Sequence, residues 1–176
     1  MVNKMSVQNI YDKLKAAIGN EYGVCALIGN LKAESGLKSN NLQNGGKGKL
    51  NMTDVEYTQM VDNGLYRHFV NDGKGYGLAQ WTYYTRKQSL LDYAKKCGSS
   101  IGDEDMQVAF LLDEIKHYGG VWYALVSTKS IRAASDVVLT KYEKPANKSE
   151  AVKIKRASLG EAIYNKICVG GLKDGK

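Results

Sequence analysis

The chain has 176 residues, the size of one ordinary domain, and 43% of them are hydrophobic with a single proline. This composition predicts a packed core and excludes a largely disordered chain. The 25 basic and 18 acidic residues give a formal net charge of +7. Such a surplus of positive charge favours an anionic partner. The candidates are nucleic acid, a membrane surface and an acidic cell-wall polymer.

Several classes of protein are excluded by the residue types and their spacing. No apolar run approaches the roughly 20 residues that cross a bilayer, so we expect no membrane insertion. The two histidines lie outside any metal-binding spacing, so we expect neither a metal nor a cofactor. The three cysteines, Cys25, Cys97 and Cys168, are far apart in the sequence. They predict isolated buried thiols rather than a disulfide framework.

The hydrophobic period is helical along most of the chain and predicts a mainly α, bundle-like fold with at most a small β-hairpin. A first helix is expected from an N-cap at Ser6 to Gly19, and a second over residues 21–35 with Gly36 as its stop. Thr53 and Glu56 form a capping-box signature for a third. Further helices are predicted over residues 85–96, from Asp103 past Ile115, over residues 130–142, and from Ser149 through Ile154, Leu159 and Ile163.

Glycine and asparagine dominate residues 40–51 and 71–76, which predicts loops. No repeat or internal linker interrupts the chain, so we expect one domain over residues 1–169. Residues 170–176 are then a C-terminal tail or a linker to a further module.

Glu34 falls on the apolar face of the second predicted helix, three residues after Leu31 and near its C-terminal end. A carboxylate there is partly desolvated and faces the negative end of the helix dipole, and both effects favour the protonated form. A general acid needs that form near neutral pH. The alternative is a helix-end carboxylate turned into water, and spacing alone leaves both open.

A glycine-rich stretch follows at residues 72–81. Its glycines let the backbone bend sharply and approach a ligand closely. A phosphate-binding loop is disfavoured because no G-K-[ST] follows and no strand precedes. The nearby aromatic residues either stack on sugar rings or bases or belong to the core. They are Tyr76, Trp81, Tyr83 and Tyr84.

The third informative stretch is residues 141–147. Tyr142 continues the apolar stripe of Ile131, Ala134 and Val138, so its ring should point inward. Its phenol either hydrogen-bonds a buried carboxyl group or reaches the surface while the ring fills the core.

Glu34-Ser35, then Gly-Tyr-Gly-Leu-Ala-Gln-Trp at 75–81 and Tyr-Glu-Lys-Pro-Ala-Asn at 142–147, resemble the phage tail lysozyme family. The chain is more distantly similar to goose-type lysozymes and lytic transglycosylases. The resemblance runs from about Tyr11 to Tyr164. It implies an α+β lysozyme-like fold with a substrate cleft.

The resemblance also implies roles for individual residues. Glu34 matches the catalytic glutamate that protonates the glycosidic oxygen between N-acetylmuramic acid and N-acetylglucosamine. Tyr142 matches a tyrosine close to that carboxyl group. The positions that match the substrate-binding motifs are Ser35, Tyr76, Gly77, Leu78, Gln80 and Trp81. The implied activity is that of an N-acetylmuramidase, a peptidoglycan hydrolase of Gram-positive cell walls.

An inverting hydrolase also needs a second carboxylate roughly 6.5–9.5 Å from the acid, to activate water. Asp72 is the first candidate because its place before the Gly-Leu-x-Gln motif is similar to the goose-type arrangement; the alternative is a loop-capping aspartate beside glycine. Asp62 and Glu56 are reserves on a helix expected to be solvated. Glu143 points about 100° away from Tyr142 around the helix and is interpreted as a salt-bridge or loop-anchoring residue.

Two other functions remain open. Ala79 stands where many goose-type relatives and transglycosylases carry methionine, which favours the lysozyme branch. A lytic transglycosylase, whose products carry an anhydro ring, is the alternative activity. A noncatalytic wall-binding module is the alternative of another class. Nucleic acid is disfavoured as the partner because the lysines are spread over several helices.

The implied substrate lies outside the bacterial cell, whereas residues 1–15 lack the apolar stretch of a signal peptide. We therefore expect an enzyme that is carried by a virion, released through a holin, or part of a longer protein.

Overall fold

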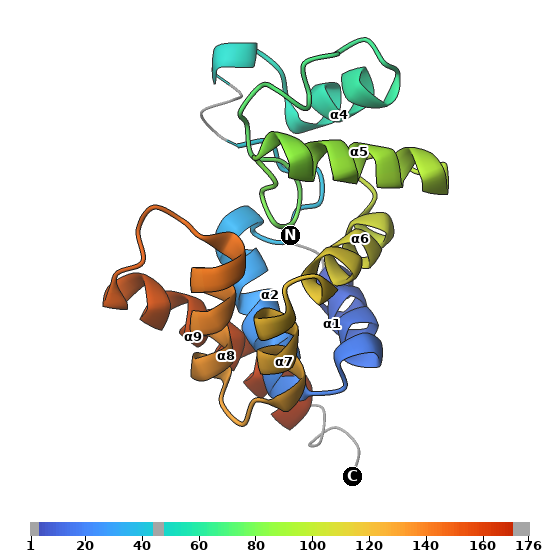
Figure 1. Ribbon diagram of the computed structural model, residues 1–176. Coiled ribbons are helices and arrows are strands. Elements are labelled where there is room, and N and C mark those ends of the chain that lie inside the picture. The colour runs from blue at the N-terminus through green and yellow to red at the C-terminus, as the bar shows by residue number, and fades with distance from the viewer. Residues whose placement is uncertain (1–3, 44–47, 171–176) are drawn as a thin grey trace. The chain divides into compact units, whose positions relative to one another are not determined.

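The computed structural model describes residues 4–43 and 48–170, and the chain divides into two compact units (Figure 1). Unit 1 comprises Met1–Ala33 and Leu112–Lys176, and unit 2 comprises Glu34–Leu111. The chain passes between the units inside two helices, α2 (Glu21–Ser35) and α6 (Glu104–Lys116). Helices dominate the described residues and β-structure is limited there to isolated bridges, which confirms the predicted mainly α class.

Unit 1 is built around α2. The other helices of this unit are α1 (Lys4–Ile18), α7 (Gly119–Ser127), α8 (Ile131–Val137), the π-helical η1 (Val138–Glu143), α9 (Glu150–Tyr164) and the π-helical η2 (Asn165–Val169). Every residue of α2 from 23 to 31 is buried. A helix that is covered on all sides belongs at the centre of its unit, and α2 takes that place.

Two glycines let neighbouring helices approach the α2 backbone. A methyl group on Gly23 would lie 1.9 Å from the carbonyl oxygen of Leu125 in α7. A methyl group on Gly29 would lie 2.6 Å from the backbone nitrogen of Gly160 in α9. Real Cβ atoms do not approach so closely, so glycine is required where α2 meets α7 and α9.

A polar network ties α2 to α8 and α9 inside the core of unit 1. Asn30 is fully buried, and its side-chain nitrogen donates to the hydroxyl of Ser135 at 2.9 Å. Arg156 in α9 donates to the side-chain oxygen of Asn30 at 3.4 Å. Buried polar groups need such partners, because an unsatisfied one costs about 1–3 kcal/mol.

Unit 2 contains α4 (Asp54–Asp62), α5 (Tyr84–Cys97) and the first part of α6. Its aromatic core includes Tyr57, whose ring centroid lies 5.5 Å from that of Tyr76 and 6.1 Å from that of Phe69. Isolated antiparallel bridges join Tyr76 to Leu42 and to Trp81. At most a small hairpin was expected near the glycine-rich loops, and in the described residues the β-structure there consists of these isolated bridges.

Most of the predicted helices are confirmed, and the differences have local reasons. Ser6 lies inside α1, which begins at Lys4, so it is not the N-cap. Helix α7 was missed because it begins at two glycines and its N-cap residue, Tyr118, makes no side-chain capping bond. Ile154 is 50% exposed, because α9 turns Ala157, Gly160 and Ile163 inward instead. Residues 171–176, most of the predicted tail, lie outside the described residues.

The capping box of α4 is present as predicted and gives a test of local stability. Thr53 accepts a hydrogen bond from the backbone N–H of Glu56 at 3.2 Å, and the Glu56 carboxylate accepts one from Thr53 at 2.8 Å. Thr53→Ala should lower the free energy of unfolding by about 1 kcal/mol in denaturant titrations. Thr85→Ala, an exposed change in α5, should stay within about 0.5 kcal/mol of the parent. Equal effects of the two variants would contradict this role for Thr53.

The same box carries a pH dependence. Hydrogen bonds from the backbone and side chain of Thr53 hold the pKa of Glu56 below its usual value. A carboxylate with a lowered folded-state pKa stabilises the fold above its unfolded pKa and loses that contribution as the pH falls through the lowered value. The parent should therefore have a higher free energy of unfolding than Glu56→Gln at neutral pH, and denaturant titrations should show this difference becoming smaller as the pH falls into the acid range.

Candidate active site

Glu34 occupies the last turn of α2 and is half-buried, on the helix and at the end expected from its spacing. The helix stops at Ser35 because Gly36 adopts the left-handed conformation, with φ of +64°. The buried hydroxyl of Ser35 donates to the carbonyl oxygen of Leu78 at 2.8 Å. Ser35 therefore fastens the residue next to Glu34 to the glycine-rich motif within unit 2.

The motif at residues 75–81 is a tight loop held by its own backbone and by residues 41–43. Tyr76 and Trp81 exchange backbone hydrogen bonds of 3.2 and 3.0 Å. The backbone N–H of Gly77 donates to the carbonyl oxygen of Asn41 at 3.0 Å. Gln80 takes a positive φ of +47° and donates from its side chain to the carbonyl oxygens of Asn41 and Gly77. The loop is thus fixed in position beside the end of α2.

Gln107, a residue of α6 that the sequence analysis did not identify, holds this loop from the other side. Its side-chain oxygen accepts from the backbone N–H of Leu78 at 2.9 Å. Its side-chain nitrogen donates to the carbonyl oxygens of Ser39 and Ile101, each at 2.6 Å. A methyl group on Gly77 would lie 2.7 Å from the same side-chain oxygen, so glycine is required there. The sequence signal was weak: Gln107 is a polar residue between Met106 and Val108 in an otherwise apolar stretch of α6, and its complete burial is known only from the structure.

Replacing Gln107 tests this support. Gln107→Leu leaves a buried N–H and two carbonyl oxygens without their partner, so the free energy of unfolding should fall by about 2–3 kcal/mol. Gln88→Leu is the matched control, because Gln88 is exposed on α5 and its side chain donates to Asp92 of the same helix. Chemical denaturation of both variants measures the difference. A Gln107→Leu protein as stable as Gln88→Leu would remove Gln107 from this role.

The aromatic residues of the motif belong to the core of unit 2. Tyr76 and Trp81 are both 0% exposed. The Tyr76 hydroxyl hydrogen-bonds Thr58 at 2.6 Å, and the Trp81 ring packs on Phe110 with centroids 5.3 Å apart. Tyr83 and Tyr84, directly after the motif, are instead 61% and 52% exposed. Of the four aromatic residues expected to stack on a ligand or to belong to the core, Tyr83 and Tyr84 are therefore the two whose rings are accessible.

Asp72 lies in a buried cluster with a lysine. Its carboxylate accepts from Lys87 Nζ at 2.5 Å, from the Tyr57 hydroxyl at 2.5 Å, from the Tyr66 hydroxyl at 3.3 Å and from the Lys74 backbone at 2.9 Å. The side chains of Lys87 and Asp72 are 0% and 5% exposed. All the partners named are groups of unit 2 that hold the loop before the motif.

Lys87, also missed by the sequence analysis, is a second anchor of that loop. Its ammonium group donates to the carbonyl oxygen of Lys74 at 2.9 Å and lies 4.4 Å from the Phe69 ring centroid. Burial lowers the pKa of Lys87, while the hydrogen bond and charge of Asp72 oppose that change. Burial and then the bond to Asp72 raise the pKa of Tyr57. The cluster therefore depends on the charge of both members of the ion pair.

Tyr142 lies in η1 of unit 1 and is 2% exposed, so its ring points inward as predicted. Its hydroxyl donates to the carboxylate of Glu114, and its ring packs edge-on against Tyr118 with centroids 5.4 Å apart. The carboxyl partner was expected from the sequence, but Glu114 was not identified as that partner. The π-helical segment that carries Tyr142 ends at Glu143, and its C-cap residue Lys144 adopts the left-handed conformation with a φ of +49°.

The two reserve carboxylates, Glu56 and Asp62, make structural hydrogen bonds within unit 2. Glu56 belongs to the capping box of α4. Asp62 accepts from the hydroxyl of Ser100 at 2.5 Å and from the backbone of Ile101 at 2.9 Å. It also lines an open hollow of about 490 Å³ with Ser39 and Asp103. Glu143 lies in η1 beside Tyr142.

The described residues contain no group of His, Cys, Asp and Glu side chains that could hold a metal ion. Within the same residues, no helix has the length and apolar character needed to span a membrane.

The matched residues cover almost the whole chain. A model of the phage tail lysozyme family matches residues 6–167, which include Glu34, the motif at 75–81 and Tyr142. The chain belongs to the phage tail lysozyme family. The predicted family is thereby confirmed, and with it a peptidoglycan-degrading activity of the lysozyme type.

Proposed function

We propose that this phage tail lysozyme is an N-acetylmuramidase, which hydrolyses the β-1,4 bond between N-acetylmuramic acid and N-acetylglucosamine. The observation that carries the proposal is the position of Glu34. Glu34 lies in the last turn of α2 and is half-buried, and the next residue, Ser35, donates a hydrogen bond to the glycine-rich motif that the family match includes.

In this proposal Glu34 is the general acid. Cleavage of a glycosidic bond needs a proton on the leaving oxygen, and a positioned carboxylic acid supplies it. The rigid link from Ser35 to Leu78 limits the movement of the adjacent Glu34 backbone, so the acid is presented in one place. Such fixed placement is worth more to the reaction than a mobile acid of equal strength.

A hydrolase that inverts the sugar configuration also needs a second carboxylate to activate water. Asp72, the first choice from sequence, would have to activate water while bonded to Lys87 and three other groups. We propose that it instead positions the loop that precedes the motif. For Tyr142 we propose that its hydroxyl holds the carboxylate of Glu114, its hydrogen-bond partner, in a fixed position. In this proposal the glycan contacts the backbone of the motif residues. These are Ser35, Tyr76, Gly77, Leu78, Gln80 and Trp81.

The charge distribution supports a wall with anionic polymers as the target. Unit 1 contains 16 lysines and arginines and 9 acidic residues, whereas unit 2 contains 9 of each, so the +7 surplus belongs to unit 1. Gram-positive walls carry acidic polymers, and a positive unit raises the local concentration of enzyme on them. We propose Gram-positive peptidoglycan as the substrate, reached from the virion, through a holin, or as part of a longer protein.

Clearing of purified Gram-positive walls tests the proposal. An active muramidase lowers the turbidity of a wall suspension and releases soluble glycan fragments. A noncatalytic wall-binding module sediments with the walls and leaves the turbidity unchanged. Binding without release of fragments would therefore overturn the proposed function.

A further inference from the structure

Two tyrosines at the start of α5 have their side chains in solvent. Tyr83, the N-cap residue, is 61% exposed, and Tyr84, the first residue of the helix, is 52% exposed. Their ring centroids lie 4.7 Å apart with an interplanar angle of 47°, so the two rings form one continuous aromatic surface. A single exposed apolar side chain is ordinary, whereas adjoining ones indicate a surface that binds a partner. We call these two rings the tyrosine pair.

The backbone that carries the tyrosine pair is anchored in the core of unit 2 on both sides. Trp81, two residues before Tyr83, is 0% exposed, and the hydroxyl of Thr82 donates to the carbonyl oxygen of Gln80 at 2.8 Å. On the other side, the backbone N–H of the buried Lys87 donates to the carbonyl oxygen of Tyr83 at 3.0 Å. The attachment of both rings is thereby fixed, and a ligand meets a surface that is already formed, which lowers the entropy cost of binding.

The tyrosine pair lies in the same unit as Glu34 and follows the motif beside it. The hydroxyl of Ser35 donates to the carbonyl oxygen of Leu78, and Tyr83 follows Leu78 by five residues. Five residues of fully extended chain span at most about 18 Å. A glycan strand is a long polymer, so one strand can contact the tyrosine pair while another of its sugars lies at Glu34.

We propose that the tyrosine pair is a stacking surface for a sugar ring of the glycan strand. The proposal rests on the proposed function, because its ligand is the substrate of that reaction. The faces of a pyranose ring carry C–H groups and its edge carries the polar substituents. A face therefore packs on an aromatic ring while the hydroxyl groups stay in water. Tyr76 and Trp81, which the family resemblance assigned to substrate binding, offer no ring face to a sugar, because both are 0% exposed.

The charge of unit 2 favours a sugar over a nucleic-acid base as the stacked group. Bases also stack on exposed aromatic side chains, but proteins that bind single strands combine such rings with a positively charged groove that follows the phosphates. Unit 2 contains 9 basic and 9 acidic residues, so its charges balance. A sugar ring is neutral and needs no such groove.

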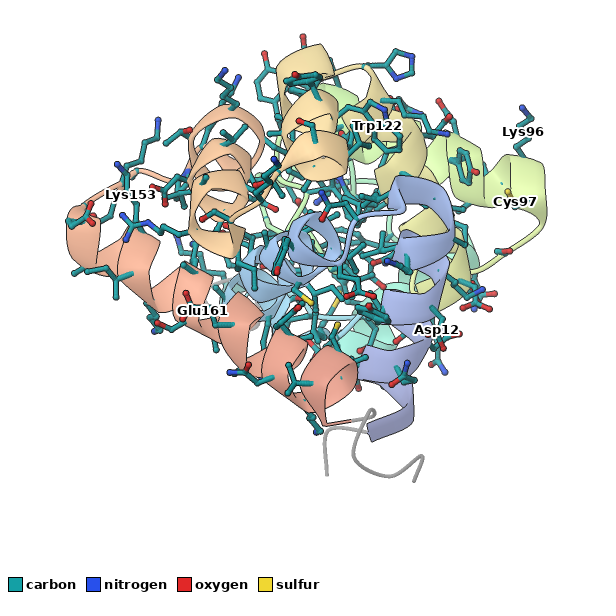
Figure 2. All side chains as sticks on the ribbon, turned by 90° about the horizontal axis from the view of Figure 1, so that it is seen from below. Asp12, Lys96, Cys97, Trp122, Lys153 and Glu161 are labelled. Carbon is teal, nitrogen blue, oxygen red and sulfur yellow. The ribbon has the colours of Figure 1, made fainter. Side chains whose placement is uncertain are left out.

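The binding measurement uses a reporter dye on Cys97, at the far end of α5 (Figure 2). Cys97 is exposed, Cys25 is buried and Cys168 is half-buried, so the expectation of buried thiols is confirmed for Cys25 and wrong for Cys97. Cys168→Ser leaves Cys97 as the accessible thiol for the dye. Helix α5 has 14 residues, and a rise of 1.5 Å per residue puts Cys97 about 20 Å from Tyr84, so the dye does not cover the tyrosine pair.

The test uses the full chain with Glu34→Gln and Cys168→Ser as background, so that the ligand is bound and not cleaved. The probe is soluble, peptide-free glycan strand prepared from Gram-positive walls. Tyr83→Ala and Tyr84→Ala should each raise the dissociation constant by roughly 3–10-fold, because each removes one ring from the stacked contact. Tyr83→Phe and Tyr84→Phe keep the rings and should stay within about twofold of the background.

Tyr123→Ala is the matched control, because Tyr123 is a 71% exposed tyrosine of unit 1, and it should bind the strand as the background does. Equal affinity of the background and Tyr83→Ala/Tyr84→Ala would overturn the proposal, as would a background protein that does not bind the strand. Phenylalanine variants as weak as the alanine variants would assign the contact to the hydroxyl groups and also overturn it. The proposed function fails on a different result, the absence of released fragments from walls treated with the parent, so the two failures are distinguishable.

Discussion

Glu34→Gln should abolish the clearing of cell walls while leaving the fold intact. Glutamine has nearly the shape of glutamate but carries no transferable proton, and removing a general acid lowers the rate by roughly 10²–10⁴-fold. Initial rates of turbidity loss measure the effect. The melting temperature and the far-ultraviolet circular dichroism should match those of the parent.

A matched control separates this effect from a general loss of negative charge. Glu161 lies exposed on α9, and Glu161→Gln makes the same chemical change on the protein surface (Figure 2). It should retain the activity of the parent. Undiminished clearing by Glu34→Gln would remove Glu34 from the mechanism, whatever the family resemblance implies.

Asp72→Asn should cause the largest loss of stability among the variants considered. Lys87 is 0% exposed, and the substitution leaves its ammonium group buried beside a neutral amide. Breaking one member of a buried ion pair costs about 3–5 kcal/mol, whereas replacing both members with uncharged groups is often close to neutral. Denaturant titration should therefore show a large loss for Asp72→Asn and partial recovery for Asp72→Asn/Lys87→Met. Asp92→Asn, an exposed change in α5, is the control.

The double variant also distinguishes the two roles of Asp72. If Asp72 positions the loop before the motif, wall-clearing activity should return together with stability. If Asp72 is the base that activates water, the double variant should fold and remain inactive. Recovery of stability without recovery of activity would contradict the positioning role.

Local features were predicted well from the sequence. The bounds of α2, the capping box of α4 and the position of Glu34 all follow from residues within one or two turns of each other. Hydrophobic spacing and helix-end signals act over that distance, so they report these features directly. The family motifs added the connection between Glu34 and the glycine-rich loop, which helix periodicity does not contain.

Long-range partners were not predicted, because periodicity says nothing about which faces meet. Gln107 lies 29 residues from Leu78 in the sequence, although its side chain accepts a hydrogen bond from the Leu78 backbone. In the sequence Lys87 looks like an ordinary exposed lysine of a helix. In the structure its ammonium group contacts both Asp72 and Phe69. Each of these groups becomes recognisable only when its burial is known.

The products of wall digestion test the central claim most directly. Mass spectrometry of fragments released from Gram-positive peptidoglycan identifies the new glycan end that cleavage creates. A muramidase with Glu34 as its acid should give fragments ending in reducing N-acetylmuramic acid, and Glu34→Gln should give none. Fragments ending only in anhydro-N-acetylmuramic acid, or cleavage confined to the peptides, would contradict the proposed hydrolysis.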